Sequence, residues 1–311
     1  MLTFKRILVP VDGSPYSTAA LTFAISLAKE HHATLVLCHV LDFDVIPTER
    51  SSVRVLGPSH AESRAVLRNA ENRVKAEGIH REALRRYGRP IAQILECVSQ
   101  HLIDAIVMGT QGKRGLKRFA LGSTTEGVLQ GAHVPVFTVH AETHTTAPFV
   151  RMLVGFDNSE PSHTAVATAI AMAQRDDSEL TLCSVVPIAP TIQGLERYGF
   201  DTHSLTDEWE SDAEYLIRHA LADAQAAGVY HIGRISPIGD PATEILRAAN
   251  EEDAELIIVG THAAHGLERL ILGSVAASLV QQSAVPVMVV RSVALSTNAQ
   301  SRLMSAISSG V

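Results

Sequence analysis

The sequence contains few of the residues that stabilise secreted or zinc-dependent proteins. Its 311 residues include only three cysteines, Cys38, Cys97 and Cys183, and no CxxC pair. An odd number without that spacing argues against a disulfide framework or a zinc site and indicates reduced thiols. No apolar run reaches the ~18 residues of a membrane helix. Asp12 interrupts the apolar stretch near the N-terminus, which does not fit a secretory signal. We therefore expect a cytoplasmic protein without a membrane span.

Several catalytic motifs are also missing. There is no GxxxxGK[ST] loop, no GxGxxG after the first apolar segment and no GxSxG turn. The turn after that segment reads VDGSPYS, which is not the SGGxDS of ATP pyrophosphatases, and no adjacent pair of acids follows it as in a receiver domain. No catalytic residue is therefore assigned.

Histidine is abundant, with 15 residues, but its positions do not favour a metal site. His31, His32, His140 and His144 fall at expected element ends or in a linker, where solvent-exposed histidine is the default. No metal ligand is assigned.

The formal net charge of −7 is unevenly distributed. Residues 1–141 carry 17 Lys and Arg against 12 Asp and Glu, whereas residues 150–311 carry 9 against 20. The basic half has no aromatic residues interleaved with its cations, so nucleic-acid binding is not expected. The opposite charges favour attraction between the two halves.

The stretch 104–139 contains the clearest candidate site. A short apolar run predicts a buried strand, a glycine-rich loop follows it, and a helical pattern begins at Ser123. The loop contains Gly109, Gly112, Gly115 and Gly122, with the cations Lys113, Arg114, Lys117 and Arg118. Glycines let the backbone approach an anion, and the N–H groups at a helix N-terminus attract negative charge. The stretch predicts a phosphate-binding site, and the alternative for its glycines is ordinary turn chemistry.

The same pattern occurs twice. Residues 255–290 repeat it with a displacement of 151, and MLVGFDNS from Met152 repeats ILVPVDGS from Ile7 with a displacement of 145. A period near ~150 residues indicates two whole domains rather than a solenoid. We expect domains at 1–141 and 150–292, and a tail at 293–311 that is either a short amphipathic helix or disordered.

Within each half, apolar strands alternate with helices. The first half predicts strands at 6–11, 33–40, 79–87, 105–108 and 134–139, with a long loop at 41–58; the second half has its long loop at 187–208. This order predicts an α/β fold with a doubly wound, parallel sheet in each domain. Ligands of such sheets bind beyond the C-terminal ends of the strands. Asp12 and Gly109 end two strands, so both are expected there, and the alternative for Asp12 is a cap for the helix after Ser14.

These residues resemble the universal stress protein family in tandem form. Gly109-x2-Gly112-x9-Gly122-Ser123 matches the family's nucleotide-binding pattern G-x2-G-x9-G-[ST], and Asp12 and Val40 match its strand-end contacts. The resemblance implies five parallel strands per domain, in a Rossmann-like or flavodoxin-like αβα sandwich, and ATP, with Mg²⁺ arriving on its phosphates. It also implies pairing of the last strands, which begin at Val134 and Val285 and end at Val139 and Val290. Pairing within one chain and a homodimer are both open.

Two sets of residues are assigned to nucleotide binding. The N-terminal set is Pro10, Asp12, Val40, Gly109, Thr110, Gly112, Lys113, Arg114, Gly115, Gly122, Ser123 and Thr124. The weaker C-terminal set is Asp157, Val185, Gly260, Gly273, Ser274 and Val275. In the second half, Ala263 replaces the second glycine, and Ala264, His265 and Glu268 replace three cations. The N-terminal site is therefore expected to bind ATP more tightly.

Three functional hypotheses remain at this point. The first is an ATP-binding regulator in the stress response, and the second is an interaction or scaffold protein that binds no nucleotide. The third is an enzyme with at most slow ATP hydrolysis, for which the sequence offers no general base.

Overall fold

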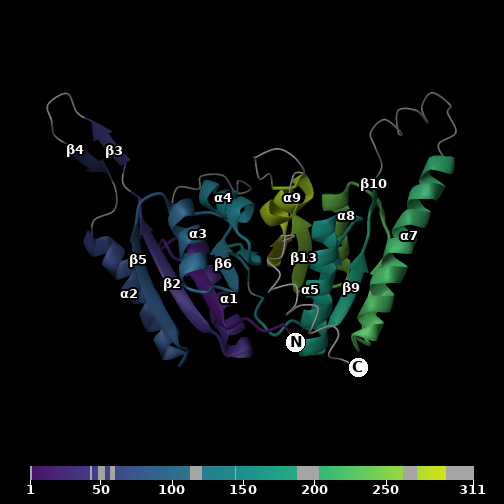
Figure 1. The fold of residues 1–311 in the computed structure, drawn as a ribbon, viewed down its shortest axis with the longest axis horizontal. Helices are drawn as coiled ribbons and strands as arrows, with labels where there is room; N and C mark the ends of the chain where they lie inside the picture. Colours follow the sequence, from purple (N-terminus) through teal and green to yellow (C-terminus); the bar gives the residue numbers. More distant parts are fainter. Residues whose placement is uncertain are drawn as a thin grey trace. The chain divides into compact units, whose positions relative to one another are not determined.

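The computed structural model describes residues 2–42, 44–47, 53–56, 60–112, 121–143, 145–187, 203–261 and 272–291. The chain divides into two compact units, of which one spans Thr3–Pro148 and the other begins at Phe149. Each unit contains a parallel sheet of five strands with helices against it (Figure 1). The predicted fold class and its duplication are confirmed.

The first unit has its strands in the order β7-β6-β1-β2-β5. They are β1 (Arg6–Pro10), β2 (Thr34–Leu41), β5 (Arg81–Tyr87), β6 (Ala105–Gly109) and β7 (Val136–Val139). Counted along the chain the order is 5-4-1-2-3, which is the Rossmann order rather than the flavodoxin order. The chain moves outward from β1 in both directions, so the switch point lies between β1 and β6.

Helices cover both faces of this sheet. They are α1 (Pro15–His31), α2 (His60–Ala76), α3 (Pro90–Gln100) and α4 (Ser123–Gly131). Arg73 of α2 donates to Thr22 of α1 at 2.7 Å, which places these helices side by side. Helices α3 and α4 contact each other and form the other layer. The predicted helix start is confirmed, since Ser14 caps α1 and Pro15 is its first residue.

The second unit repeats this plan with the order β11-β9-β8-β13-β14. Its strands are β8 (Arg151–Gly155), β9 (Glu179–Cys183), β11 (Ile232–Ile235), β13 (Leu256–Thr261) and β14 (Val287–Arg291). Its helices are α5 (Glu160–Asp176), α7 (His203–Ala226), α8 (Pro241–Glu251) and α9 (Ser274–Gln282). The two-residue strands β10 (Val186–Pro187) and β12 (Ile238–Gly239) pair beside the sheet.

Two loop predictions were wrong in part. Within the expected loop 41–58, β3 (Asp44–Pro47) and β4 (Val53–Leu56) form an antiparallel pair. Their β-branched residues favour strands, and the Gly and Pro turn signals around them had suggested a loop. The expected loop 187–208 ends earlier, because α7 begins at His203.

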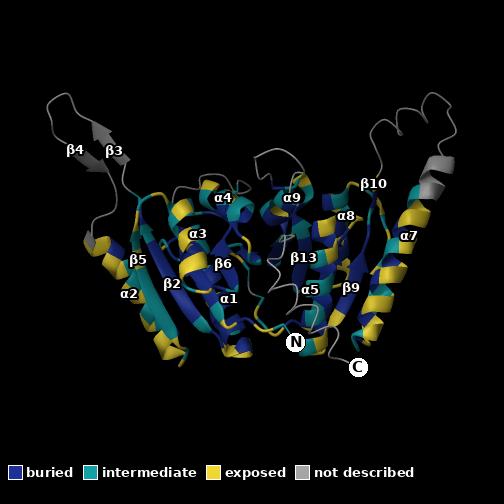
Figure 2. Cartoon of the chain, in the orientation of Figure 1, coloured by how far each residue is buried: buried dark blue, intermediate teal, exposed yellow. Residues whose placement is uncertain are grey.

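Most strands are buried and form the core of each unit, whereas the edge strands β5 and β11 contain no buried residue; the outward faces of the helices are exposed (Figure 2). One histidine belongs to that core and not to the solvent-exposed group predicted from the sequence. His31 is 4% exposed, accepts the Phe4 N–H at 3.0 Å and lies against the Phe4 ring. Phe4 in turn meets Phe137 edge-on, so His31 is an extension of an aromatic cluster. Cys38 and Cys183 are also buried.

Several expectations remain predictions. These are the domain boundaries at 141, 150 and 292 and the pairing of the segments that begin at Val134 and Val285. The tail 293–311 and His144 lie outside the described residues. Among the helices that the structure describes, none is long and apolar enough to cross a membrane.

Candidate functional site

The candidate site of the first unit lies at the switch point of its sheet. Ile7 of β1 pairs with Ala105 of β6, so the chain leaves both strands at one edge. There Asp12 and Gly112 come together, as the sequence predicted. A Cβ atom on Gly112 would lie only 2.9 Å from Asp12 Oδ2. Glycine therefore brings the loop backbone close to a carboxylate.

Asp12 also supports the turn into α1. Its Oδ1 accepts the Ser14 N–H at 2.8 Å, while Ser14 Oγ accepts the Ser17 N–H at 3.1 Å. The alternative role suggested by the sequence, support for the helix start, is therefore present. One carboxylate oxygen serves the turn and the other faces the Gly112 loop, so Asp12 links the two segments.

The two ends of the glycine-rich loop lie next to each other. Gly122 N–H donates to the Thr110 carbonyl at 2.9 Å, and the Thr110 N–H donates to the Val139 carbonyl at 3.1 Å. The Thr110 side chain is 1% exposed and its Oγ1 lies 3.2 Å from His140 Nδ1. Thr110 thus anchors the loop, and its hydroxyl is already engaged. Lys113, Arg114 and Gly115 lie outside the described residues.

Helix α4 begins directly after the loop returns. Gly122 is its N-cap residue, and no side chain caps its first turn. A Cβ on Gly122 would lie 3.3 Å from the Thr110 carbonyl oxygen, so glycine suits this contact. Ser123 is exposed, Thr124 is half-buried, and Thr125 Oγ1 donates to the Gly109 carbonyl at 2.8 Å. The N-terminus of α4 offers backbone N–H groups beside the loop, which suits an anion.

Close packing explains why residue 109 is a glycine, and sequence reasoning missed this explanation. A Cβ there would lie 2.7 Å from the backbone of Tyr16 in α1. Gly260 has the same role, because its Cβ would lie 2.5 Å from the Pro161 backbone in α5. The recurrence of this glycine in both halves is therefore explained by close packing of the first helix on the fourth strand.

Pro10 and Val40 lie at the same edge. Pro10 ends β1 and pairs with Cys38 in β2, and Val40 is two residues further along, opposite Arg86. Both are half-buried. Between Cys38 and Val40, His39 is 4% exposed and its Nδ1 lies 2.6 Å from the Val11 carbonyl. Sequence reasoning missed His39, which ties β2 to the end of β1; its only signal was a polar residue inside an apolar strand.

The equivalent residues of the second unit are arranged differently. Asp157 is exposed, and its Oδ1 accepts both the Ser159 N–H at 3.0 Å and the Ser162 hydroxyl at 2.6 Å. In the first unit, Ser17 Oγ instead donates to the Ser14 carbonyl at 3.1 Å. The Asp157 carboxylate is therefore engaged by a serine hydroxyl as well as by the turn.

The remaining residues of the second set follow the duplicated plan. Val185 lies beyond the end of β9, whereas Val40 lies within β2. Gly273 is the N-cap of α9, which no side chain caps, and Ser274 and Val275 begin that helix. Ala263, Ala264, His265 and Glu268 lie outside the described residues.

Sequence reasoning also missed a cation at the edge of the second sheet. Arg291 pairs in register with Thr261, in the places of His140 and Thr110. Among the described residues, Arg291 Nε and Nη2 and Thr261 Oγ1 are buried and have no hydrogen-bond partner. Burial lowers the pKa of Arg291 below its ordinary value. Arg291 therefore supplies positive charge at this edge of the second unit.

Comparison with known proteins gives a consistent result. A model described as the universal stress protein family matches residues 3–140 and 148–291. A universal stress protein of Mycolicibacterium smegmatis is 30% identical over 304 residues, which cover 92% of this chain and 96% of that protein. A universal stress protein of Methanocaldococcus jannaschii is 37% identical over 141 residues, 44% of this chain and 82% of that protein.

A solved structure has the same fold. The crystal structure of a universal stress protein from Archaeoglobus fulgidus matches this chain with a TM-score of 0.67 and 22% identity. The match covers 92% of this chain and 98% of that chain. At this identity the likeness supports the architecture of both units and carries no further functional statement.

Proposed function

Because the chain belongs to the universal stress protein family, we propose that its first unit binds ATP and acts as a nucleotide-linked regulator in the stress response. The ATP lies at the switch point between β1 and β6. Turnover is at most slow in this proposal, because none of the described residues at this edge is assigned as a general base. Mg²⁺ accompanies the ATP, because the phosphates supply most of its ligands.

One observation carries this proposal: Asp12 and the Gly112 loop meet at the edge where α4 begins. A carboxylate suits the ribose or base of a nucleotide, and loop amides with a helix N-terminus suit its phosphates. The edge therefore places a group suited to the sugar or base next to groups suited to the phosphates. Lys113 and Arg114 follow Gly112 in the sequence and supply positive charge for the phosphates.

The second unit binds ATP weakly or not at all in this proposal. Its loop sequence has lost three cations, and each charge-assisted contact is typically worth ~1.5–3 kcal/mol. The engagement of Asp157 by the Ser162 hydroxyl supports the same ranking. The half-buried Arg291 opposes this ranking, but it is a single cation, and the loop sequence has lost three.

Calorimetric titration of ATP onto the intact chain tests the site with a matched pair of variants. Asp12→Ala should weaken ATP binding about tenfold or more, because it removes a charge-assisted contact. Asp157→Ala should change the affinity much less. Circular dichroism checks that both variants remain folded. A larger effect of Asp157→Ala, or absence of ATP binding in the unsubstituted chain, would contradict the proposal.

A scaffold protein that binds no nucleotide is the second candidate. It is favoured by the packing roles of Gly109 and Gly122, because neither glycine requires a ligand. Denaturing the purified protein and identifying released nucleotide separates the two candidates. Adenine nucleotide in stoichiometric amount supports the regulator. A chain that is free of nucleotide and also shows no thermal shift with ATP supports the scaffold.

A further inference from the structure

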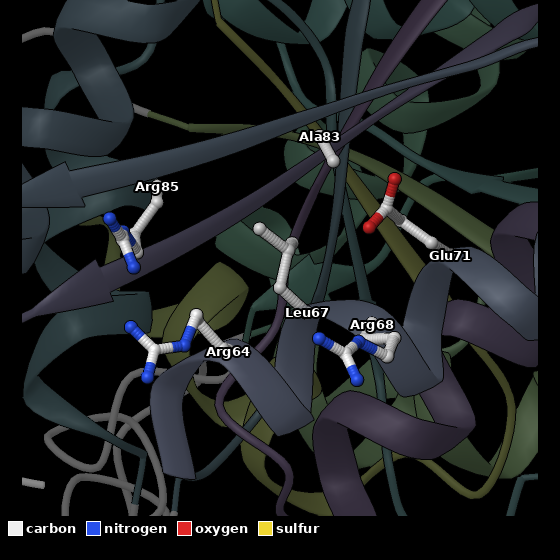
Figure 3. Close-up of a pocket in the computed structure, with 6 residues that line it drawn as sticks. All are labelled: Arg64, Leu67, Arg68, Glu71, Ala83 and Arg85. Atoms are coloured by element: carbon white, nitrogen blue, oxygen red, sulfur yellow. The ribbon is translucent and has the colours of Figure 1, made fainter. Parts of the chain in front are cut away.

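A second candidate site lies at the opposite end of the first sheet from β7. Helix α2 and strand β5 form a groove of about 340 Å³, lined by Arg64, Leu67, Arg68, Glu71, Ala83 and Arg85. Figure 3 shows Leu67 pointing from α2 toward Ala83 on β5, with Arg64 and Arg85 on one side and Glu71 on the other. The floor is therefore apolar and the rim is mainly basic.

The three arginines of this groove lack acidic partners. Among the described residues, Arg64 and Arg68 have no hydrogen bond or ion pair, and Arg85 lies over the Tyr87 ring at 5.6 Å. By contrast, two other arginines of the same unit have partners: Arg6 bonds Glu82 at 2.7 Å, and Arg86 bonds Gln100 at 2.8 Å. The groove thus concentrates guanidinium groups that remain available to an anionic ligand.

Strand β5 has one unpaired edge. It pairs along its length with β2, from Arg81 beside Leu35 to Tyr87 beside Leu41, and it ends the sheet. No described strand pairs with its other side. Its sequence, REALRRY, contains neither proline nor glycine, so its backbone is suited to accept another strand.

The spacing of the arginines matches an extended peptide. Arg64 and Arg68 are four residues apart on α2, so they lie on one face about 6 Å apart along the axis. Alternate side chains of a strand point to one face and repeat every ~6.6–6.8 Å. Carboxylates at alternate positions of a strand beside β5 therefore match both guanidinium groups.

We propose that the α2–β5 groove binds an extended acidic peptide, which adds to β5 as an edge strand and places alternate carboxylates against Arg64, Arg68 and Arg85. Main-chain hydrogen bonds supply affinity, and the charge pattern supplies specificity. Glu71 repels an acidic side chain, so its end of the groove favours a peptide position without a carboxylate. This site is separate from the nucleotide edge and does not depend on ATP binding.

The competing role for these arginines is protection of an exposed edge against aggregation. That role requires charge on the edge but no particular spacing of a ligand's carboxylates. It also predicts self-association when the arginines are replaced. The two roles therefore differ in their response to peptide pattern and to substitution.

Fluorescence anisotropy with the intact chain tests the proposal. The probe is a short, capped, labelled peptide with Glu at alternate positions. It should bind more tightly than a peptide of the same composition with adjacent Glu residues, and more tightly than an N-methylated version that cannot form main-chain hydrogen bonds. Arg64→Glu with Arg68→Glu should weaken binding about tenfold or more, since two attractive pairs become repulsive.

The matched control is Lys75→Glu with Arg89→Glu, which makes the same change in net charge at exposed cations outside the groove. The control should bind the probe within about twofold of the unsubstituted chain, since distant exposed charges are screened. An equal loss of affinity in both double variants would overturn the proposal, as would equal binding of the three peptides. Self-association of the groove variant with unchanged probe binding would assign the arginines to edge protection instead.

Discussion

At the scale of single residues, Gly109, which ends β6, and Gly112, in the loop that follows, meet different neighbours. A Cβ on Gly109 would enter the Tyr16 backbone, whereas a Cβ on Gly112 would meet only the end of the Asp12 side chain. A backbone contact cannot move without moving α1, whereas the Asp12 carboxylate can shift without moving the backbone, at the expense of its hydrogen bond from the Ser14 N–H. Substitution of Gly109 should therefore mainly change the stability of the unit, and substitution of Gly112 should mainly change ligand binding.

We predict that Gly109→Ala destabilises the first unit by about 1–3 kcal/mol, the usual cost of overpacking. Gly112→Ala should cost less than about 1 kcal/mol and should instead weaken ATP binding, because it alters the loop beside Asp12. Denaturant unfolding and ATP titration of both variants measure the two effects. Gly260→Ala is the control, since its cost should fall on the second unit. An unstable Gly112→Ala protein, or a stable Gly109→Ala protein, would refute this division.

The same residues show which features of the site could be predicted from the sequence and which could not. The alternation of strands and helices implied that Asp12 and Gly112 share an edge, because parallel strands end together. The role of Gly109 could not be predicted, since it depends on how closely α1 approaches β6. The burial of His31 was missed for a similar reason: Phe4, which covers it, lies 27 residues away.

At the scale of elements, α3 and α8 occupy equivalent places but begin differently. Asp240 caps α8 by accepting the Thr243 N–H at 2.9 Å. The equivalent residue of α3 is Arg89, whose side chain makes no capping hydrogen bond. A cation at a helix N-terminus also opposes the helix dipole. The duplicated fold thus contains one capped and one uncapped version of the same helix.

We predict that Arg89→Asp stabilises the first unit by about 0.5–2 kcal/mol, and that Asp240→Ala destabilises the second by a similar amount. The hydrogen bonds from the Thr243 side chain and backbone lower the pKa of Asp240 below its ordinary value. Stability from this carboxylate is therefore present above the unfolded pKa of ~3.9 and is lost as the pH falls through the folded pKa.

Thermal unfolding at neutral and acidic pH measures this effect. The difference between the unsubstituted chain and Asp240→Ala should shrink on acidification, and Arg89→Ala controls for loss of the cation alone. A difference that grows as the pH falls would contradict the assigned role. Neither this cap nor the β3–β4 pair was predicted from the sequence, and turn residues on both sides of the β3–β4 pair favoured a loop there.

At the scale of the whole molecule, each unit has its own sheet and buried core. Domains with separate cores commonly unfold as separate cooperative units. The chain also contains a single tryptophan, Trp209, which lies in α7 of the second unit. Its fluorescence therefore follows the second unit alone, while calorimetry follows both.

We predict that ATP raises one of two unfolding transitions and leaves the midpoint of Trp209 fluorescence unchanged. A ligand at 100 times its dissociation constant stabilises its own domain by about 2.7 kcal/mol, which corresponds to several degrees. Asp12→Ala should reduce the shift to about half or less, because a tenfold weaker site gains correspondingly less from the same ATP concentration. Asp157→Ala should preserve the shift. If ATP raises the Trp209 midpoint in the Asp12→Ala protein, the second unit binds nucleotide and the proposed ranking of the sites is wrong. If that shift appears only with Asp12 intact, the units unfold together, and the independence argued from their separate cores fails.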